Sequence, residues 1–166
     1  MIEIMVVMIV LTISMAMFSS TLVGTARQNA NKREVTRAAE GARRQLEILR
    51  SEPFDQIFAL YNPSADDDPP AAAAPGAAFD VEGLEAVPGD PDGRVGEVVF
   101  ASTGPTLRED AVHAALGMPR DLSGDLAIDD GDHSGDYIIL PVLVRVRWQG
   151  ATGPHVLEMQ SLFTDL

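Results

Sequence analysis

Residues 1–28 read MIEIMVVMIVLTISMAMFSSTLVGTARQ, and the 23 residues from Ile4 to Ala26 carry no formal charge. As an α-helix that rises about 1.5 Å per residue, this apolar run spans about 35 Å, which is enough to cross the hydrocarbon core of a bilayer. The sequence therefore predicts a membrane-spanning helix in residues 1–26. One carboxylate, that of Glu3, lies almost at the start of the run, and a simple membrane anchor gives no reason for it.

The helical composition continues beyond the apolar run, because no proline precedes Pro53 and good helix formers dominate up to that point. We predict one helix from near residue 2 to about Arg50, with a kink or restart near residue 52. The apolar residues after Arg27 form a single stripe: Val35, Ala39, Ala42, Leu46 and Leu49. Residues 27–62 are therefore expected to form an amphipathic half that packs on a globular head, and an exposed coiled-coil stalk is the alternative.

The sequence after the helix changes character twice. Residues 63–78, PSADDDPPAAAAPGAA, contain little that a core could bury, so they are predicted to form an extended loop. Residues 79–166 then follow the alternating pattern that is typical of strands. Apolar runs at 79–87 and 95–101 indicate short strands in this acidic, β-rich head.

The clearest strands come last in the chain. Residues 137–149 and 155–165 alternate apolar and polar positions, and GATGP (150–154) is expected to join them as a β-hairpin. Trp148, the only tryptophan, is expected to anchor the core of this hairpin. The predicted fold class is α+β: a long N-terminal helix, membrane-spanning in its first half, packed on a small antiparallel sheet that ends in a hairpin.

Charge and composition restrict the function classes. Residues 51–166 carry five Lys/Arg against twenty-one Asp/Glu, so the head is strongly acidic and no nucleic-acid partner is expected. The chain has no cysteine, which excludes disulfides and thiolate chemistry, and its three histidines do not form a metal-binding pair on one helix face. Neither a Gly-rich phosphate loop nor a nucleophile elbow is present, so we expect a protein that is not an enzyme.

The start MIEIMVVMIVLTISM (1–15) resembles that of mature type IV pilins and type II secretion pseudopilins, which open with Phe-Thr-Leu-Ile-Glu and a long apolar run. Residues 38–57 and 142–164 are similar to the helix end and the Trp-bearing terminal hairpin of minor pilins and I-type minor pseudopilins. The resemblance places Met1, Ile2 and Glu3 at the third to fifth positions of the mature motif. It therefore implies two further residues and a basic, cleavable leader upstream.

The resemblance also implies a function and a location. It implies a non-enzymatic structural subunit of a pilus-like or secretion filament, in which Glu3 pairs with the N-terminal ammonium of a neighbour and Met1 and Ile2 belong to the same assembly segment. The implied partners are other pilin or pseudopilin subunits, the membrane, which the chain crosses once, and a prepilin peptidase that processes the precursor. The implied location is the inner membrane with the head outside the cytoplasm, and then a cell-envelope filament. The positive-inside rule, applied only to the basic residues that follow the span, favours the opposite orientation, with the head in the cytoplasm. These residues are Arg27, Lys32, Arg33 and Arg37.

Residues 121–132, DLSGDLAIDDGD, fit the spacing of a twelve-residue calcium loop. The candidate ligands at positions 1, 3, 5, 7, 9 and 12 are Asp121, Ser123, Asp125, the carbonyl of Ala127, Asp129 and Asp132. Leu126 occupies the position where such loops usually have Gly, and a solvated acidic loop without an ion is the alternative. Ca²⁺ is thus the one candidate cofactor. A membrane-anchored extracytoplasmic calcium-binding or adhesion module is the alternative function, in which Glu3 would be incidental.

Overall fold

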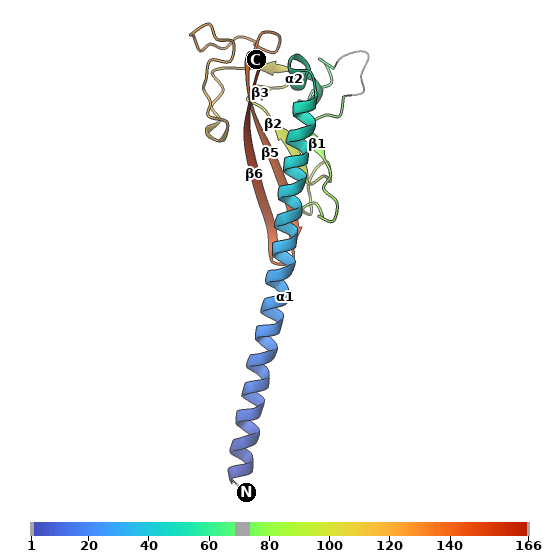
Figure 1. The fold of residues 1–166 in the computed structure, drawn as a ribbon, viewed down its shortest axis with the longest axis vertical. Coiled ribbons are helices and arrows are strands. Elements are labelled where there is room, and N and C mark those ends of the chain that lie inside the picture. The colour runs from blue at the N-terminus through green and yellow to red at the C-terminus, as the bar shows by residue number, and fades with distance from the viewer. Residues whose placement is uncertain (1, 69–73, 166) are drawn as a thin grey trace.

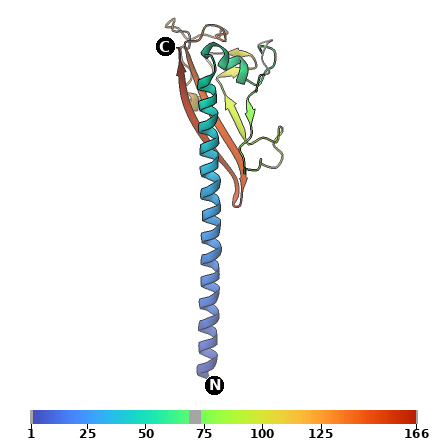
Figure 2. The same ribbon diagram turned by 45° about the vertical axis from the view of Figure 1, so that its right-hand side comes forward.

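The computed structural model describes residues 2–68 and 74–165 and has the predicted α+β architecture. Helix α1 (Ile2–Ser51) runs without a break for 50 residues. Its N-terminal half extends away from the head, and its C-terminal half lies along the sheet (Figures 1 and 2). The prediction of one helix from near residue 2 to about Arg50 is confirmed.

The expected restart follows directly after α1. A one-turn 3₁₀ helix, η1 (Phe54–Gln56), leads into the short helix α2 (Ile57–Tyr61). Pro53 has extended backbone dihedrals (φ −56°, ψ 131°), which breaks the helix as a proline without an N–H is expected to do. The Ser51 hydroxyl donates to the carbonyl of Ile48 at 2.7 Å and therefore does not cap the new helix.

The head contains a four-stranded antiparallel sheet of order β1-β2-β5-β6. Its strands are β1 (Ala78–Phe79), β2 (Gly96–Val99), β5 (Ile139–Gly150) and β6 (Gly153–Thr164). Strands β3 (Ser102–Thr103) and β4 (Thr106–Leu107) pair as a second, small sheet, and η2 (Ala114–Leu116) is a single 3₁₀ turn. Between β4 and β5 the chain is mostly loop.

The strand boundaries differ from the sequence-based expectation most clearly at two places. The strand expected over 79–87 ends at Phe79, because the chain turns at Gly83 (φ 76°) and the N–H of Leu84 bonds to the carbonyl of Val81. The hairpin loop expected over 150–154 is only two residues long, because Gly150 already pairs with Gly153. The hairpin itself is confirmed, and it is the longest pairing in the sheet.

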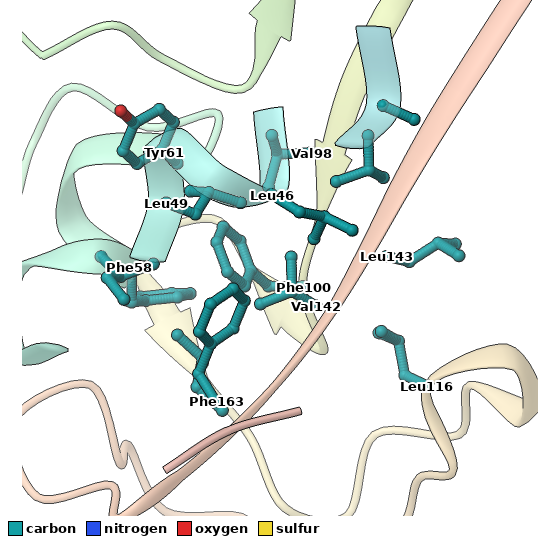
Figure 3. Packing of buried hydrophobic residues seen from close by; sticks show 14 of the residues in the cluster. Leu46, Leu49, Phe58, Tyr61, Val98, Phe100, Leu116, Val142, Leu143 and Phe163 are labelled. Carbon is teal, nitrogen blue, oxygen red and sulfur yellow. The ribbon is translucent and has the colours of Figure 1, made fainter. Parts of the chain in front are cut away.

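The core lies between α1, α2 and one face of the sheet. Figure 3 shows Leu46 and Leu49 of α1 close to Phe58, Phe100 and Val142. The sheet residues on this face are almost completely buried: Val142, Val144, Val146 and Trp148. Leu143 is also buried; it points to the other face of β5, as alternation in a strand requires, and lies near Leu116 in Figure 3.

The buried face of α1 differs slightly from the predicted stripe. Ala42, Leu46 and Leu49 are buried as expected, but Ala38 takes the buried position instead of Ala39, and Val35 is 41% exposed. Because both 38 and 39 are alanine, an apolar pattern cannot distinguish which of them faces the sheet. Residues 38–49 pack on the head, so this part of the helix is not an exposed stalk.

Tyr137 ties the beginning of the terminal hairpin to the helix restart. Its hydroxyl donates to the carbonyl of Phe54 at 2.5 Å, and the two rings pack with their centroids 4.9 Å apart. The side chain is 7% exposed, and this burial raises the pKa of Tyr137 to about 12. The folded-state pKa thus exceeds the ordinary value of 10.0.

We expect Tyr137→Phe to lower the free energy of unfolding by about 1 kcal/mol at neutral pH, the usual net value of one hydrogen bond. A raised pKa contributes stability that is present below the ordinary value and is lost as pH rises through the folded-state value of about 12. The difference between wild type and variant should therefore shrink above about pH 10. Urea unfolding of the detergent-solubilised protein, followed by Trp148 fluorescence, measures it. A difference that stays constant up to pH 12 would contradict the assignment.

Candidate functional site

The N-terminal half of α1 is the first candidate site. Every described side chain from residue 2 to residue 29 is exposed, including large apolar ones such as Ile2 (79%) and Phe18 (67%). The helix is long and apolar enough to cross a membrane, and no part of its apolar window is buried in the head. A continuous apolar surface of this size requires lipid or other protein around it.

The neutral polar side chains in this segment are satisfied within the helix. Hydroxyl groups donate to carbonyls three or four residues earlier, as Thr12 does to Met8 at 2.7 Å and Ser14 does to Val10 at 2.8 Å. Such bonds allow Ser and Thr to enter a bilayer without an unpaired donor. Glu3 differs from them, because it is the only charged side chain between residues 1 and 26.

Glu3 lies in the first turn of α1, where the positive end of the helix dipole stabilises a carboxylate. Within the described part of the chain it makes no hydrogen bond or ion pair with another side chain. Ile2 is the first described residue of α1, and Met1 lies outside the described residues. If this end of the helix is buried among other helices, a partner for the Glu3 carboxylate has to come from outside the described residues.

The second candidate site is an acidic cluster in the loops between β4 and β5, at the end of the head away from the N-terminus (Figure 1). Two backbone hydrogen bonds hold the segment after β4 against the later loop: Asp110 N–H donates to Asp129 at 3.2 Å, and His133 N–H donates to Leu107 at 2.9 Å. These bonds bring Glu109 beside residues 129–133.

Glu109 is the buried centre of this cluster, with 1% of its surface exposed. Its Oε1 accepts hydrogen bonds from the backbone N–H groups of Leu122 at 2.6 Å and Ser123 at 2.9 Å. Its Oε2 has no hydrogen-bond partner among the described residues and lies 3.8 Å from Nε2 of His133. Arg108, the adjacent cation, pairs instead with Asp110 at 2.7 Å. Burying a carboxylate oxygen without a hydrogen-bond partner costs folding free energy, so Oε2 of Glu109 is a candidate functional group in the head.

His133 lies between three carboxylates and is only 8% exposed. Its Nε2 is 3.1 Å from Oδ1 of Asp129, and its Nδ1 is 3.1 Å from Oδ1 of Asp136. Burial lowers the pKa of His133, but the hydrogen bond to Asp129 and the charge of Glu109 outweigh it, so the pKa is raised above its ordinary value. Donor atoms of Glu109, Asp129 and His133 lie within 4.8 Å of one another.

The residues of the predicted calcium loop fall into separate places. Asp121 and Asp125 form a second group with Glu109, whereas Asp129 belongs to the group that contains His133. Asp132 turns toward β4, because its Oδ1 accepts the N–H groups of Leu107 at 3.1 Å and Ser134 at 3.0 Å. In the described residues three of the predicted carboxylates, those of Asp121, Asp125 and Asp129, therefore lie at two points that share Glu109, and Asp132 belongs to neither. Ca²⁺ binding by this loop stays a prediction.

Loop turns account for much of the hydrogen bonding in this segment. Burial raises the pKa of Asp121, but hydrogen bonds from the N–H groups of Gly124 and Leu126 to its carboxylate outweigh burial, so the pKa lies below its ordinary value. Ser123 Oγ lies 3.4 Å from the same carboxylate. Ala127 contributes its N–H to Asp125 at 2.8 Å. Leu126 has a φ of 71°, the left-handed conformation that Gly usually supplies, and is 95% exposed.

Sequence analysis missed Glu109, His133 and Asp136. Nothing in the sequence marks Glu109 as the buried one among so many acidic residues. His133 could have been found from the sequence, because it directly follows the acidic loop, with Asp129 four residues before it and Asp136 three residues after it. These residues lie in a loop, so a search for metal-binding pairs on one helix face does not find them.

Comparisons of the chain with models of known families, with curated proteins and with solved structures found no match.

Proposed function

We propose that the protein is a non-enzymatic structural subunit, a minor pilin or pseudopilin, which assembles into a type IV pilus-like or type II secretion filament through α1. The observation that carries the proposal is the fully exposed apolar half of a continuous helix, with one carboxylate in its first turn. A carboxylate at the centre of a membrane-spanning helix costs about 2.5–3.5 kcal/mol even on insertion scales, and the Glu3 carboxylate would meet a similarly apolar environment if this helix end were buried among other helices. A neighbour's N-terminal ammonium beside Glu3 offsets this cost, whereas a simple anchor supplies no such partner.

The junction between α1 and the head also supports assembly. Residues 38–49 are packed into the core, and side chains on either side of this stretch hold the helix to the sheet layer. Arg37 donates to the carbonyl of Gly83 at 3.1 Å, and Arg50 donates to Ser161 at 3.3 Å while its guanidinium lies over the Phe163 ring. The head and this part of the helix therefore share one core, so in the proposed filament a register set at Glu3 would also set the position of the head.

The charges after the span fit a filament as well. Arg27, Lys32 and Arg33 are exposed and form no ion pair within the described chain, while residues 51–166 carry a large excess of acidic groups. In a stack of staggered subunits, the basic part of one helix would face the acidic heads of others. In this proposal the chain is first held in the inner membrane with its head outside the cytoplasm, and prepilin peptidase processes its precursor before assembly.

Fractionation of the cell envelope tests the proposal. The protein, expressed from its own gene with a tag on the head, should sediment with filaments sheared from the cells, together with other subunits that have apolar N-terminal helices. The matched control carries residues 27–166 behind an unrelated single-pass helix and should stay in the inner membrane. Equal distribution of the two proteins would contradict the proposal.

A further inference from the structure

The buried oxygen of Glu109 and the ring of His133 point to a metal site in the head that does not depend on how α1 assembles. We propose that Glu109, Asp129 and His133 bind a divalent first-row transition metal ion such as Zn²⁺. The site lies where the segment after β4 meets the loop before β5, and its three donor atoms lie within 4.8 Å of one another.

The ring of His133 joins this cluster to Asp136. Both ring nitrogens face carboxylate oxygens, which can only accept: Nδ1 lies 3.1 Å from Asp136 Oδ1, and Nε2 lies 3.1 Å from Asp129 Oδ1. When Nδ1 keeps its proton for Asp136, Nε2 presents its lone pair to Asp129 Oδ1 at 3.1 Å and Glu109 Oε2 at 3.8 Å, which are also acceptors. A cation between these three acceptors, either a proton on Nε2 or a metal ion, removes their mutual repulsion. A carboxylate bonded to the far nitrogen is the usual outer partner of a metal-binding histidine.

The spacing of the donors suits a small tetrahedral ion. Ligands about 2.0–2.2 Å from Zn²⁺ lie about 3.3–3.6 Å from one another in a tetrahedron. The distances from Nε2 to the two oxygens, 3.1 and 3.8 Å, bracket that range. A proton on Nε2 would satisfy Asp129 at 3.1 Å, but it would leave Glu109 Oε2 without a hydrogen bond.

The chemistry of the donors determines the class of metal. An imidazole nitrogen with two carboxylates is a ligand set for Zn²⁺ and its neighbours, whereas Ca²⁺ takes six to eight oxygens and no imidazole. Glu109 is fixed by the N–H groups of Leu122 and Ser123, and His133 is fixed by Asp136, so these two donors are held in place before the ion arrives. The Asp129 side chain is 54% exposed, which leaves room for a water molecule as the fourth ligand.

Metal titration of the full chain tests the site. The protein is purified in detergent without a histidine tag, stripped with a chelator and titrated with Zn²⁺ by calorimetry. Co²⁺ absorption then reports the coordination geometry. We expect one Zn²⁺ per chain and the intense visible bands of tetrahedral Co²⁺. Asp136→Asn should weaken Zn²⁺ binding about 10- to 100-fold, as is usual for an outer partner.

Ligand variants and matched controls separate this site from other binding. Glu109→Gln keeps an oxygen for the N–H groups of Leu122 and Ser123, so it should fold, with an unchanged Trp148 emission, and should lose tight Zn²⁺ binding, as should His133→Gln. The controls Asp130→Asn and His155→Gln remove an equivalent group outside the cluster and should bind as wild type does. Unchanged Zn²⁺ affinity in His133→Gln would overturn the proposal, as would a chain that binds Ca²⁺ but not Zn²⁺, or ring ¹⁵N shifts showing a protonated His133 that Zn²⁺ does not alter.

Discussion

Replacing Glu3 with alanine is expected to leave membrane insertion intact and to lower incorporation into filaments by at least about a hundredfold. Insertion should not suffer, because the change removes the one carboxylate from an otherwise uncharged span. Assembly should suffer, because in the proposed filament a neighbour's ammonium would lose its partner, and breaking a buried ion pair costs about 3–5 kcal/mol. At about 1.4 kcal/mol for each factor of ten, the lower figure already gives the expected loss.

The measurement compares the amount of the protein in sheared filaments with the amount in the membrane fraction. Glu47→Ala is the matched control, since Glu47 is an exposed carboxylate on the same helix but beyond the span. It should assemble as wild type does. Glu3→Asp, which keeps the charge on a shorter side chain, should recover part of the assembly. If Glu3→Ala and Glu47→Ala entered filaments equally well, Glu3 would have no role in assembly.

The second large effect is expected in the head. Trp148→Ala should lower the free energy of unfolding by about 3–5 kcal/mol, the range observed for large buried aromatic residues. Trp148 is 1% exposed, its ring stacks on His155 with centroids 5.4 Å apart, and its Nε1 donates to Glu34 of α1 at 3.3 Å. The substitution therefore leaves a cavity and also removes a contact between the hairpin and the helix.

Urea unfolding followed by tyrosine fluorescence measures this loss, because both tyrosines, Tyr61 and Tyr137, are buried in the head. Val156→Ala serves as the control on the same hairpin, since Val156 is 59% exposed. Its effect should stay within about 0.5 kcal/mol. Unfolding midpoints of Trp148→Ala and Val156→Ala that agree within error would show that Trp148 does not anchor the core.

The parts of the fold with a strong periodic pattern could be predicted from the sequence. The apolar run, the absence of proline before Pro53 and the alternation around Trp148 define α1 and the β5–β6 hairpin, and the structure has both. The region between them was predicted less well. A strand over 79–87 was expected from apolar content alone, but the turn at Gly83 depends on local backbone conformation that this content does not encode.

The acidic cluster shows a different limit of sequence reasoning. Spacing alone placed Asp121, Asp125, Asp129 and Asp132 in one calcium loop, because a linear pattern treats every carboxylate as free. In the structure Asp132 is held by the N–H groups of Leu107 and Ser134. The buried carboxylate, that of Glu109, comes from a separate segment. Its burial is a tertiary property, and one sequence without its contacts cannot reveal it.

In the proposed filament Glu3 lies against the N-terminus of another subunit. Photo-cross-linking in cells tests it most directly, with a photoreactive residue in place of Ile4, next to Glu3 and 69% exposed. We expect an adduct with the N-terminal segment of another subunit that has an apolar helix, identified by mass spectrometry and lost when Glu3→Ala is added. Adducts with lipid only, or a protein adduct that Glu3→Ala leaves unchanged, would show that Glu3 does not pair with another subunit.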